Sequence, residues 1–512
     1  MAQTAPIAPA TPSPRWDALA AMLVLAACLA TRLPTFGYPA ATTDEQLYSA
    51  IGQAILAGEL PYVDVWDRKP IGLFLLFALG HLIAGPSPLG FQLIAFAFAA
   101  AGGWLVQRIA RRTVPPLTAA LAGALYPVGI ALLGSQSGQS EVFWALPMLV
   151  MAWCVLRLLD DPGRRRLGWA AMLAGGLALQ IKYTVAPQCA VLGVAALWAR
   201  RRGRVPSAGL IGQATLYASI GLAPTVLVAG SYAVIGHLDA FLFANFESIF
   251  LRGPAAGLDP RVAPLLGLMA ALAAAGTVYL LAVAPERGTA DHAIIFAWLA
   301  GAGATLFMGT TVYVYYLAGL VAPTILAALP FLDQRNRFGA APAALLLALA
   351  LVKFDPGARY RDRLADEAEL ATVDAELRPR LARPGAFLFV HDGPTALYGA
   401  RSSRPPSVLL YPDHFNNALE ARALPVVPDR EVARLLSCRP AAVVTSPDAM
   451  TDRNLSAEAA LRRGLTIGYR KMKTMPFDDR RLDLWLPANP AEAPAHPQCL
   501  ATLSESQSAQ DH

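Results

Sequence analysis

Charged residues are scarce in this chain of 512 residues. Asp, Glu, Lys and Arg make up 15% of the sequence and hydrophobic residues 55%, and the mean hydropathy is +0.43. Soluble globular proteins carry about 25% charged residues, so this scarcity excludes a water-soluble globule of ordinary composition. The composition predicts a polytopic α-helical membrane protein.

Other familiar features are missing from the sequence. It contains no Cys or His spacing typical of a metal site, no nucleotide-binding glycine loop and no convincing internal repeat. The missing repeat argues against a transporter or lipid flippase built from two related halves. No cofactor is assigned from the sequence, and a divalent cation stays open as an alternative.

The positive charge follows a pattern. The formal net charge is +6, and the arginines gather beside apolar runs, at Arg108–Arg112, Arg164–Arg166, Arg200–Arg204 and Arg335–Arg337. Short loops rich in arginine mark the cytoplasmic side of membrane proteins. The excess of basic residues therefore indicates membrane topology, and no nucleic-acid partner is predicted.

About eleven apolar runs have the length and composition of membrane spans. They are Trp16–Pro34, Leu89–Gln107, Pro115–Gly134, Val142–Leu159, Leu167–Ile181, Val185–Ala199, Ala208–Ile235, Ala263–Ala284, His292–Gly309, Tyr313–Leu332 and Phe338–Phe354. The first run also resembles a signal peptide, and Leu25–Cys28 resembles a lipoprotein cleavage box. Its length and the topology favour a span.

A further run, Pro70–Gly85, is short and carries His81. If Arg108–Arg112 and Arg164–Arg166 are both cytoplasmic, a chain that starts inside leaves through the first span and returns through Leu89–Gln107. Pro70–Gly85 then cannot cross, so it is predicted to dip into the outer leaflet. Residues 35–87 become one periplasmic loop, and the tail after the last span is also outside.

The expected organisation has three regions. Residues 1–15 are a disordered cytoplasmic N-terminus, residues 16–354 a transmembrane domain, and residues 355–512 a periplasmic α/β domain. In this tail, helices are expected over Tyr360–Leu381, Arg430–Leu436 and Ala457–Arg463, and strands over Ala386–Val390, Val408–Tyr411 and Ala441–Thr445. Cys438 and Cys499 pair only if the tail lies in an oxidising compartment. The other cysteines, Cys28, Cys154 and Cys189, are expected to be small buried residues of the spans.

The stretch Thr43–Phe74 crowds acids, bases and aromatic residues between two apolar segments. Thr43 and Gln46 have the spacing of a capping box, with Asp44 and Glu45 in the first turn beside the positive helix end. Apolar residues then repeat at helical spacing. We therefore predict an amphipathic helix on the membrane surface.

Polar side chains converge on the face predicted to be extracytoplasmic. They include Asp44, Glu45, Asp64, Asp67, Arg68 and Lys69 in the first loop and Glu141, Lys182, Arg252, Tyr315 and Tyr316 in later loops. Ionisable groups near a membrane are costly, so their concentration on one side indicates a functional site. The alternative is that loops are simply where charged residues accumulate.

These residues resemble the first loop of polyprenyl-phosphate-sugar-dependent glycosyltransferases of the C type, the GT-C superfamily. The likeness is to the protein mannosyltransferase-like and lipid A aminoarabinose transferase-like families. The matching elements are Asp44-Glu45 opening a helix, the Gly58…Pro61-Tyr62 turn, Asp67-Arg68-Lys69-Pro70 before a short apolar helix, Glu141 ahead of a span, Lys182 near the end of the fifth span, and Tyr315-Tyr316 with Pro323. The resemblance covers roughly residues 16–354.

Three positions depart from the family pattern. Ile71 stands where a second proline is usual, Gln92 where many members have arginine, and Tyr315 where histidine is common. These departures leave the subfamily and the substrate open.

The resemblance implies an enzyme of the bacterial inner membrane that moves a hexosyl or pentosyl group from a polyprenyl-phosphate donor to an extracytoplasmic lipid, glycan or protein. The reaction needs a base near the acceptor hydroxyl and a cation beside the leaving phosphate. Asp44 is the candidate base, and Glu45 is its alternative. The candidate phosphate partners are Arg68 and Lys69, followed by Lys182 and Arg252. Glu141 is expected to orient the acceptor or help to hold a divalent ion, and Tyr62, Tyr315 and Tyr316 to contact the substrate.

Structural interpretations stay open beside the catalytic ones. Asp44 and Glu45 would then only cap a helix, and Arg68 and Lys69 would only bind anionic headgroups. Tyr62 would be an interface anchor. For the whole chain, the rivals are a multispan transporter or lipid flippase and a non-catalytic membrane scaffold.

Overall fold

The computed structural model describes residues 14–202, 207–253, 259–283, 289–309, 311–399, 404–489 and 499. The chain divides into two compact units. The first comprises residues 1–34, 95–225 and 258–356, and the second comprises residues 35–94, 226–257 and 357–512. The segments expected to form the first loop and the tail therefore belong to the same unit.

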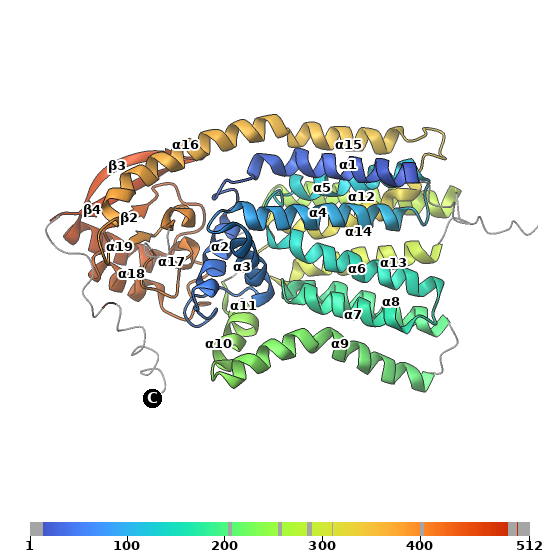
Figure 1. Cartoon of the computed structure of the whole chain (residues 1–512), viewed down its shortest axis with the longest axis horizontal. Coiled ribbons are helices and arrows are strands. Elements are labelled where there is room, and N and C mark those ends of the chain that lie inside the picture. Colours follow the sequence, from blue (N-terminus) through green and yellow to red (C-terminus); the bar gives the residue numbers. More distant parts are fainter. Residues whose placement is uncertain are drawn as a thin grey trace, which may run out of the picture. The chain divides into compact units, whose positions relative to one another are not determined.

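The first unit is helical, and two of its helices, α4 and α9, also contribute residues to the second unit. Its helices are α1 (Pro14–Arg32), α4 (Leu89–Ala110), α5 (Pro116–Leu132), α6 (Ser140–Asp160), α7 (Arg165–Leu179), α8 (Ala186–Arg202), α9 (Ser207–Val234), α12 (Val262–Val283), α13 (Thr289–Thr305), α14 (Ala318–Leu332) and α15 (Ala341–Phe354). Helices α6, α7 and α8 pack side by side, as do α1, α5 and α15 (Figure 1).

The predicted fold class is confirmed. Each of the eleven expected spans coincides with a helix, and eight helices of the described residues are long and apolar enough to cross a membrane. Helices α13, α14 and α15 reach this length together with the helical residues next to them. The remaining three, α5, α7 and α8, have 17, 15 and 17 residues. Residues 1–13 of the expected disordered N-terminus lie outside the described residues, but Pro14 and Arg15 already belong to α1.

Glycines allow the helices of this unit to approach closely, as their positions within spans suggest. A Cβ atom on Gly102 would lie 2.6 Å from the Tyr126 ring, and one on Gly176 would lie 2.4 Å from the Gly221 carbonyl oxygen. Lipid tails are as apolar as leucine, so membrane helices associate through such close packing. Side chains larger than hydrogen at these positions would push the helices apart.

Ion pairs gather several loop ends of the first unit at one face. Arg112 at the end of α4 binds Asp160 at the end of α6 and Asp291 at the start of α13, each at 2.6 Å. Arg335 donates to the Thr113 carbonyl oxygen at 2.6 Å. The arginine-flanked ends predicted to share one side of the membrane therefore do share one face of this unit.

The second unit combines short helices with a small sheet. Its helices are α2 (Thr43–Leu56), α3 (Ile71–Ala84), α10 (Leu238–Leu242), α11 (Ser248–Leu251), α16 (Pro356–Leu381), α17 (Pro412–Asn416), α18 (Pro428–Ser437) and α19 (Leu455–Gly468). Its strands are β1 (Leu388–Val390), β2 (Ala442–Thr445), β3 (Tyr469–Phe477) and β4 (Arg480–Pro487). The described strands form one sheet in the order β1-β2-β4-β3, in which only β1 and β2 run parallel.

Helices α2 and α3 pack against each other at Gly52, where a Cβ atom would lie 2.8 Å from the Ala78 amide nitrogen. Helix α3 has 14 residues, about 21 Å at 1.5 Å per residue, which is shorter than a hydrocarbon core of about 30 Å. The expected span α7 has only 15 residues, so length does not separate α3 from the spans. That α3 does not cross and dips into a leaflet stays a prediction.

The predicted capping box of α2 is wrong. The N-cap is Thr42, and in the described residues no side-chain hydrogen bond caps this helix. Gln46 instead donates to the Thr42 carbonyl oxygen at 3.3 Å and accepts from the Ala396 amide at 3.0 Å. A tertiary contact with the tail therefore uses the side chain that the local pattern assigned to the cap.

The tail is α/β, as predicted, with two differences. Val408–Tyr411 forms no strand in the described residues 404–489, although the Val408 carbonyl oxygen accepts from the Trp66 amide at 2.9 Å. The hairpin of β3 and β4 was not predicted. Strand β3 exposes five consecutive residues, Arg470–Thr474, so it lacks the alternation of apolar and polar residues that identifies a half-buried strand.

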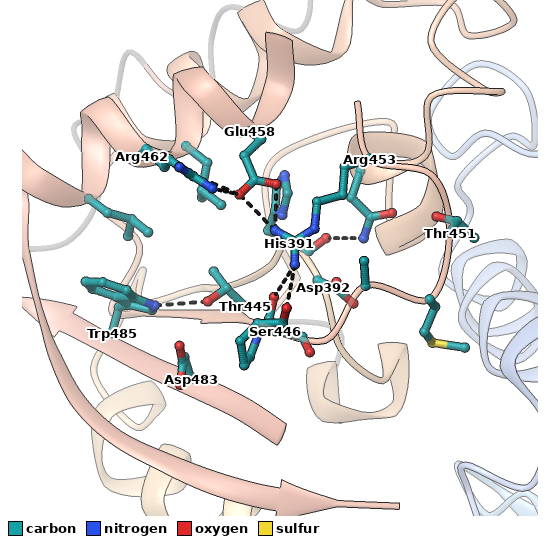
Figure 2. Close-up of a pocket in the computed structure, with 16 residues that line it drawn as sticks. His391, Asp392, Thr445, Ser446, Thr451, Arg453, Glu458, Arg462, Asp483 and Trp485 are labelled. Atoms are coloured by element: carbon teal, nitrogen blue, oxygen red, sulfur yellow. Dashed lines mark hydrogen bonds and ion pairs between the residues drawn. The ribbon is translucent and has the colours of Figure 1, made fainter. Parts of the chain in front are cut away.

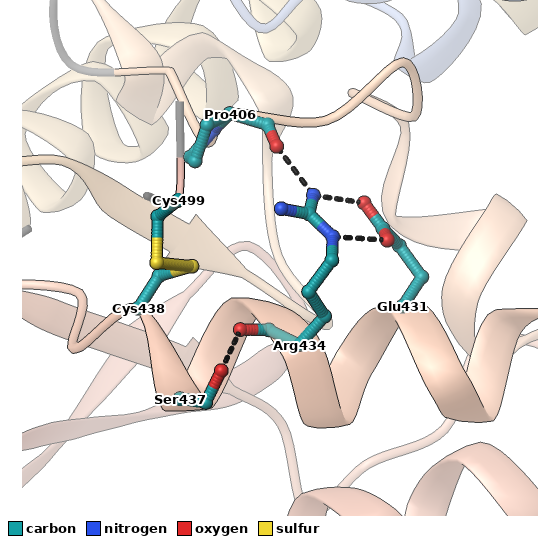
Figure 3. Close-up of a disulfide and its surroundings, with 6 residues drawn as sticks. All are labelled: Pro406, Glu431, Arg434, Ser437, Cys438 and Cys499. Carbon is teal, nitrogen blue, oxygen red and sulfur yellow. Dashed lines mark hydrogen bonds and ion pairs between the residues drawn. A yellow bond between two sulfur atoms is a disulfide. The ribbon is translucent and has the colours of Figure 1, made fainter. Parts of the chain in front are cut away.

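A disulfide joins Cys438, at the end of α18, to Cys499, with Cα atoms 5.7 Å apart (Figure 3). Beside it Arg434 donates to Glu431 at 2.7 Å and to the Pro406 carbonyl oxygen. The pairing that the sequence made conditional on an oxidising compartment is present. Cys28 and Cys154 are buried, as expected, and Cys189 is half-buried.

Candidate active site

Two arginines converge on one carboxylate in the second unit. Arg68 Nη1 lies 3.0 Å from Glu420 Oε1, and Arg252 Nη2 lies 2.8 Å from the same oxygen. The side chains of Arg68, Arg252 and Glu420 are 13%, 8% and 6% exposed. This point of convergence is an anion-binding position, because planar guanidinium groups bind carboxylates and phosphates with the same N–H donors.

Glu420 is held in its charged form. Burial would raise the pKa of Glu420, but the charge and hydrogen bonds of Arg68 and the charge of Arg252 outweigh it and lower that pKa to about 2. A carboxylate with such a pKa is ionised at any physiological pH. The two guanidinium groups therefore face a permanent anion.

The segment before α3 carries a second cation in a fixed position. Lys69 Nζ lies 3.7 Å from Asp67 Oδ2 and 5.4 Å from the centre of the Tyr48 ring. Asp67 is 2% exposed, and its other oxygen accepts from the Arg68 amide at 2.6 Å. Asp67 thus orients both the backbone of Arg68 and the ammonium group of Lys69.

Tyr62 anchors this segment to its surroundings. Its hydroxyl donates to the Lys69 carbonyl oxygen at 2.9 Å, and its ring lies 5.5 Å from that of Tyr232. Its φ is +71°, a left-handed conformation that costs a bulky residue energy and is kept only where the surroundings enforce it. Tyr62 is 3% exposed, so it positions Lys69 from within the unit, and its predicted contact with substrate stays a prediction.

The acidic residues of α2 differ in accessibility. Asp44 is half-buried, and the Tyr411 hydroxyl lies 3.5 Å from its Oδ1 atom. Glu45 is fully buried. A base must reach the acceptor hydroxyl, so Asp44 is the better placed of the two.

A half-buried carboxyl group, Asp413, and a buried imidazole, His414, from the tail lie close to these groups. Burial first, and then the negative charges of Glu420 and Asp44, raise the pKa of Asp413 to about 7. Burial lowers the pKa of His414 to about 4, and its ring lies 5.0 Å from that of Trp66. Asp413 is therefore largely protonated and His414 neutral at slightly acid pH.

The remaining predicted residues meet in the first unit. Lys182, between α7 and α8, forms an ion pair with Glu141 in the first turn of α6, and these side chains are 9% and 1% exposed. Lys182 Nζ lies 3.9 Å from the centre of the Tyr316 ring and 5.9 Å from that of Tyr315. Glu141 also accepts from the Ser140 hydroxyl at 3.0 Å. Four predicted site residues from three loops therefore form one cluster.

The predicted residues thus divide between the units. Asp44, Glu45, Tyr62, Arg68, Lys69 and Arg252 belong to the second unit, and Glu141, Lys182, Tyr315 and Tyr316 belong to the first. In the residues that the structure describes, no three His, Cys, Asp or Glu side chains come close enough to hold a metal ion. The divalent cation stays an untested alternative.

Sequence reasoning missed the residues that the tail contributes. Glu420, Tyr411, Asp413 and His414 all contact or influence the first-loop residues. The stretch Tyr411–His414 concentrates an acid, an imidazole and a phenol after an apolar run, which is a usable signal. Glu420 stands alone in its segment, and no local pattern identifies it.

The helices define a multispan helical membrane protein with a small mixed sheet in its tail, as the sequence predicted. Residues 68–242 match the family described as dolichyl-phosphate-mannose-protein mannosyltransferase. This match includes Arg68, Lys69, Glu141 and Lys182 and begins after Asp44. No curated protein sequence matches the chain.

Solved structures share the fold. ArnT from Cupriavidus metallidurans bound to undecaprenyl phosphate has a TM-score of 0.60 and 17% identity, with 94% of this chain and 100% of that chain covered. Its apo state has a TM-score of 0.60 and 16% identity, with coverages of 91% and 97%. The oligosaccharyltransferase of Archaeoglobus fulgidus in the apo form has a TM-score of 0.50 and 11% identity, with coverages of 85% and 70%. The chain has an ArnT-like fold, and the family resemblance predicted from the first loop is confirmed.

Proposed function

We propose that this chain is a glycosyltransferase that uses a polyprenyl-phosphate-linked sugar and modifies an extracytoplasmic lipid, glycan or protein. The observation that carries the proposal is the convergence of Arg68 and Arg252 on one buried anion. Arg68 and its neighbour Lys69 also begin the segment that matches the mannosyltransferase family. A lipid-borne phosphate is the anion that this family handles. ArnT, whose fold this chain shares, was solved with undecaprenyl phosphate.

The cations have a defined task in such a reaction. The acceptor hydroxyl oxygen forms a bond to the anomeric carbon, while the bond from that carbon to the phosphate oxygen breaks and its electron pair stays on the phosphate. Negative charge therefore develops on the polyprenyl phosphate as it leaves. Arg68, Arg252 and Lys69 stabilise that charge, which lowers the barrier more than it stabilises the bound donor.

Asp44 accepts the proton of the acceptor hydroxyl. It is half-buried and lies in the first turn of α2, where the helix dipole favours a carboxylate. Glu45 is completely buried, which supports a structural part for it in α2. Lys182, Glu141, Tyr315 and Tyr316 form a separate polar cluster in the first unit, and the substrate contacts expected for them stay a prediction.

The proposed setting is the bacterial inner membrane, with the N-terminus in the cytoplasm and the tail in the periplasm. The face of the first unit that gathers Arg112, Asp160 and Asp291 carries the arginine-rich loops expected inside. The disulfide between Cys438 and Cys499 supports an oxidising compartment for the tail.

The test is transfer by the purified protein. Radiolabelled polyprenyl-phosphate sugars are offered with a membrane-glycan extract, and labelled product is counted for wild type, Asp44→Asn and Asp64→Asn. Asp64 is an exposed carboxylate of the same loop that accepts from the Leu60 amide, so it is a matched control. We expect Asp44→Asn to lose about 10²–10⁴-fold in rate, as when a general base is removed, and Asp64→Asn to keep its activity.

Two results would count against the proposal, and they differ. Equal transfer by wild type and Asp44→Asn would remove the assignment of the base and leave the enzyme class intact. No transfer by wild type from any polyprenyl-phosphate sugar would remove the enzyme class itself.

A further inference from the structure

The tail contains a pocket of about 530 Å³ that is separate from the residues discussed so far. It opens where the parallel strands β1 and β2 end, and α19 and β4 complete it (Figure 2). Its polar lining includes His391, Asp392, Arg453, Glu458, Asp483 and Trp485. In α/β sheets, ligands bind beyond the carboxyl ends of parallel strands, and this volume lies within the range of about 300–1,000 Å³ typical of ligand pockets.

The charges that line the pocket are mutually satisfied. Arg453 Nη1 binds both oxygens of Glu458, at 2.8 and 2.7 Å, and its Nη2 atom donates to the carbonyl oxygens of Ser446 and Pro447 at 3.2 and 2.8 Å. Arg462 binds the same carboxylate at 2.7 Å but is 75% exposed. The hydrogen-bonding capacity of Arg453 is therefore largely used within the protein, and Arg462 is screened by water.

Carboxylates outnumber cations in the described lining, where Asp392, Glu458 and Asp483 face Arg453 and Arg462. Lys471 binds Asp483 at 2.8 Å from outside the lining, and Arg480 does the same for Asp392. Each of the three carboxylates is thus already paired with a cation, so the described part of the site offers no unpaired charge of either sign to an ionic ligand. The site therefore favours an uncharged ligand that both donates and accepts hydrogen bonds.

His391 supplies the second observation that indicates a ligand. Its side chain is 96% buried, since the residue is 4% exposed, and it lines the pocket. Its Nε2 atom has no hydrogen-bond partner among the described residues. Buried polar atoms of native proteins are nearly always satisfied, so a polar group from outside the protein is expected at this position.

Trp485 adds an aromatic surface of fixed orientation. Its indole nitrogen donates to the Thr445 hydroxyl at 3.0 Å (Figure 2), which fixes the orientation of the ring. An aromatic ring next to paired carboxylates and guanidinium groups matches a sugar ring, which has apolar C–H faces and a rim of hydroxyl groups. Hydroxyl groups of this kind can also satisfy a neutral imidazole.

We propose that this pocket binds an uncharged carbohydrate segment. The sugar hydroxyls bond to Asp392, Glu458, Asp483 and His391, and one sugar face packs on Trp485. The inference does not depend on transferase activity. A glycan held here would be brought to the same unit that carries Asp44 and Arg68.

The experiment measures binding by the full chain in nanodiscs, because maltoside detergents carry sugar headgroups that would compete. The probes are neutral hexasaccharides of glucose, galactose, mannose and N-acetylglucosamine, together with sialylated and phosphorylated oligosaccharides. We expect at least one neutral probe to bind and the anionic probes to bind more weakly. We expect Trp485→Ala to weaken the neutral probe by about tenfold or more, as loss of an aromatic anchor does.

A matched pair of variants separates the pocket from general effects. Arg462→Ala removes one of the two cations that bind Glu458, a proposed sugar contact. Arg463→Ala changes the next residue of α19, which is exposed and lies outside the lining. Only the first is expected to change the dissociation constant. Trp485→Phe keeps an aromatic ring, so it retains part of the binding and shows whether loss in Trp485→Ala comes from the ring or from misfolding.

The proposal is overturned if no neutral probe binds, if only anionic probes bind, or if Arg462→Ala and Arg463→Ala behave alike. None of these outcomes bears on the transfer assay. Transfer without carbohydrate binding here would remove this inference alone, and binding without transfer would remove the proposed function alone.

Discussion

The two polar clusters of this protein arrange their charges differently. In the second unit, Arg68 and Arg252 converge on one oxygen of Glu420. In the first, Lys182 is matched with Glu141 and covered by the Tyr316 ring. A convergent pair of arginines can exchange one anion for another, because the donors stay in place. A one-to-one buried pair cannot lose a member without leaving a charge stranded.

The largest expected effect comes from breaking the one-to-one pair. Lys182→Met leaves Glu141 buried without its cation, which typically costs about 3–5 kcal/mol of stability. We expect a large fall in the melting temperature of the purified protein, and recovery of much of it in the double variant Glu141→Gln/Lys182→Met. Arg261→Ala is the control, because that arginine is 76% exposed in its pair with Asp259. A Lys182→Met protein as stable as wild type would mean that the pair contributes nothing to folding.

Breaking the convergent pair should affect transfer more than stability. Under the proposed function, Arg68→Ala removes a donor beside the leaving phosphate, and losing one such electrostatic stabiliser costs about 10²–10³-fold in rate. Arg68→Lys keeps the charge without the planar fork of the guanidinium group, so its transfer rate should lie between those of wild type and Arg68→Ala. Arg422→Ala, an exposed arginine close to Glu420 in sequence, is the control. Unchanged transfer by Arg68→Ala would assign the leaving-group role elsewhere.

A smaller effect is expected from removing the anion itself. If Glu420 occupies the position of the phosphate, Glu420→Gln removes a competing charge and leaves both arginines in place. Polyprenyl phosphate should then bind more tightly, by up to about tenfold, which corresponds to about 1.4 kcal/mol. Isothermal titration against wild type measures the change. Weaker binding would show that Glu420 orients the arginines and does not compete with the ligand.

The smallest effect concerns the pH dependence of stability, to which Asp413 and His414, neighbours of Glu420, contribute. Because the pKa of Asp413 is raised to about 7, the folded state retains a proton that the unfolded state releases near pH 4. Asp413 therefore lowers stability as pH rises from about 4 to about 7. As the pH rises across this window, the melting temperature of Asp413→Asn should increase relative to that of wild type.

His414 changes the stability of the protein with pH in the opposite direction. Its pKa is lowered to about 4, so the unfolded state binds the extra proton, and stability rises with pH between about 4 and about 6.5. Relative to wild type, His414→Gln should therefore lose its advantage as pH rises through the same window. If the two variants shifted the profile in the same direction, the burial of one of these groups would be wrongly assigned.

The second unit shows where prediction from sequence ends. The helix after Thr43 and the residues Asp44, Arg68 and Lys69 were identified because turn chemistry and helical periodicity act over a few residues. Strand β3 was missed because its pairing with β4 holds it, although its exposed face has no alternation. Val408–Tyr411 has strand-like composition, but without a ladder partner in the described sheet it stays irregular.

By itself, the sequence determined the membrane class, the positions of the spans and the loop that carries the candidate base. Long apolar runs, arginine clusters and helix starts are local properties, so each can be recognised from a short stretch of sequence. Only the tertiary structure decided that Glu420, 352 residues from Arg68, shares its carboxylate with two arginines. It likewise decided that His391 and Trp485 line one pocket. Such contacts depend on how distant segments pack together, and no short window of residues contains that information.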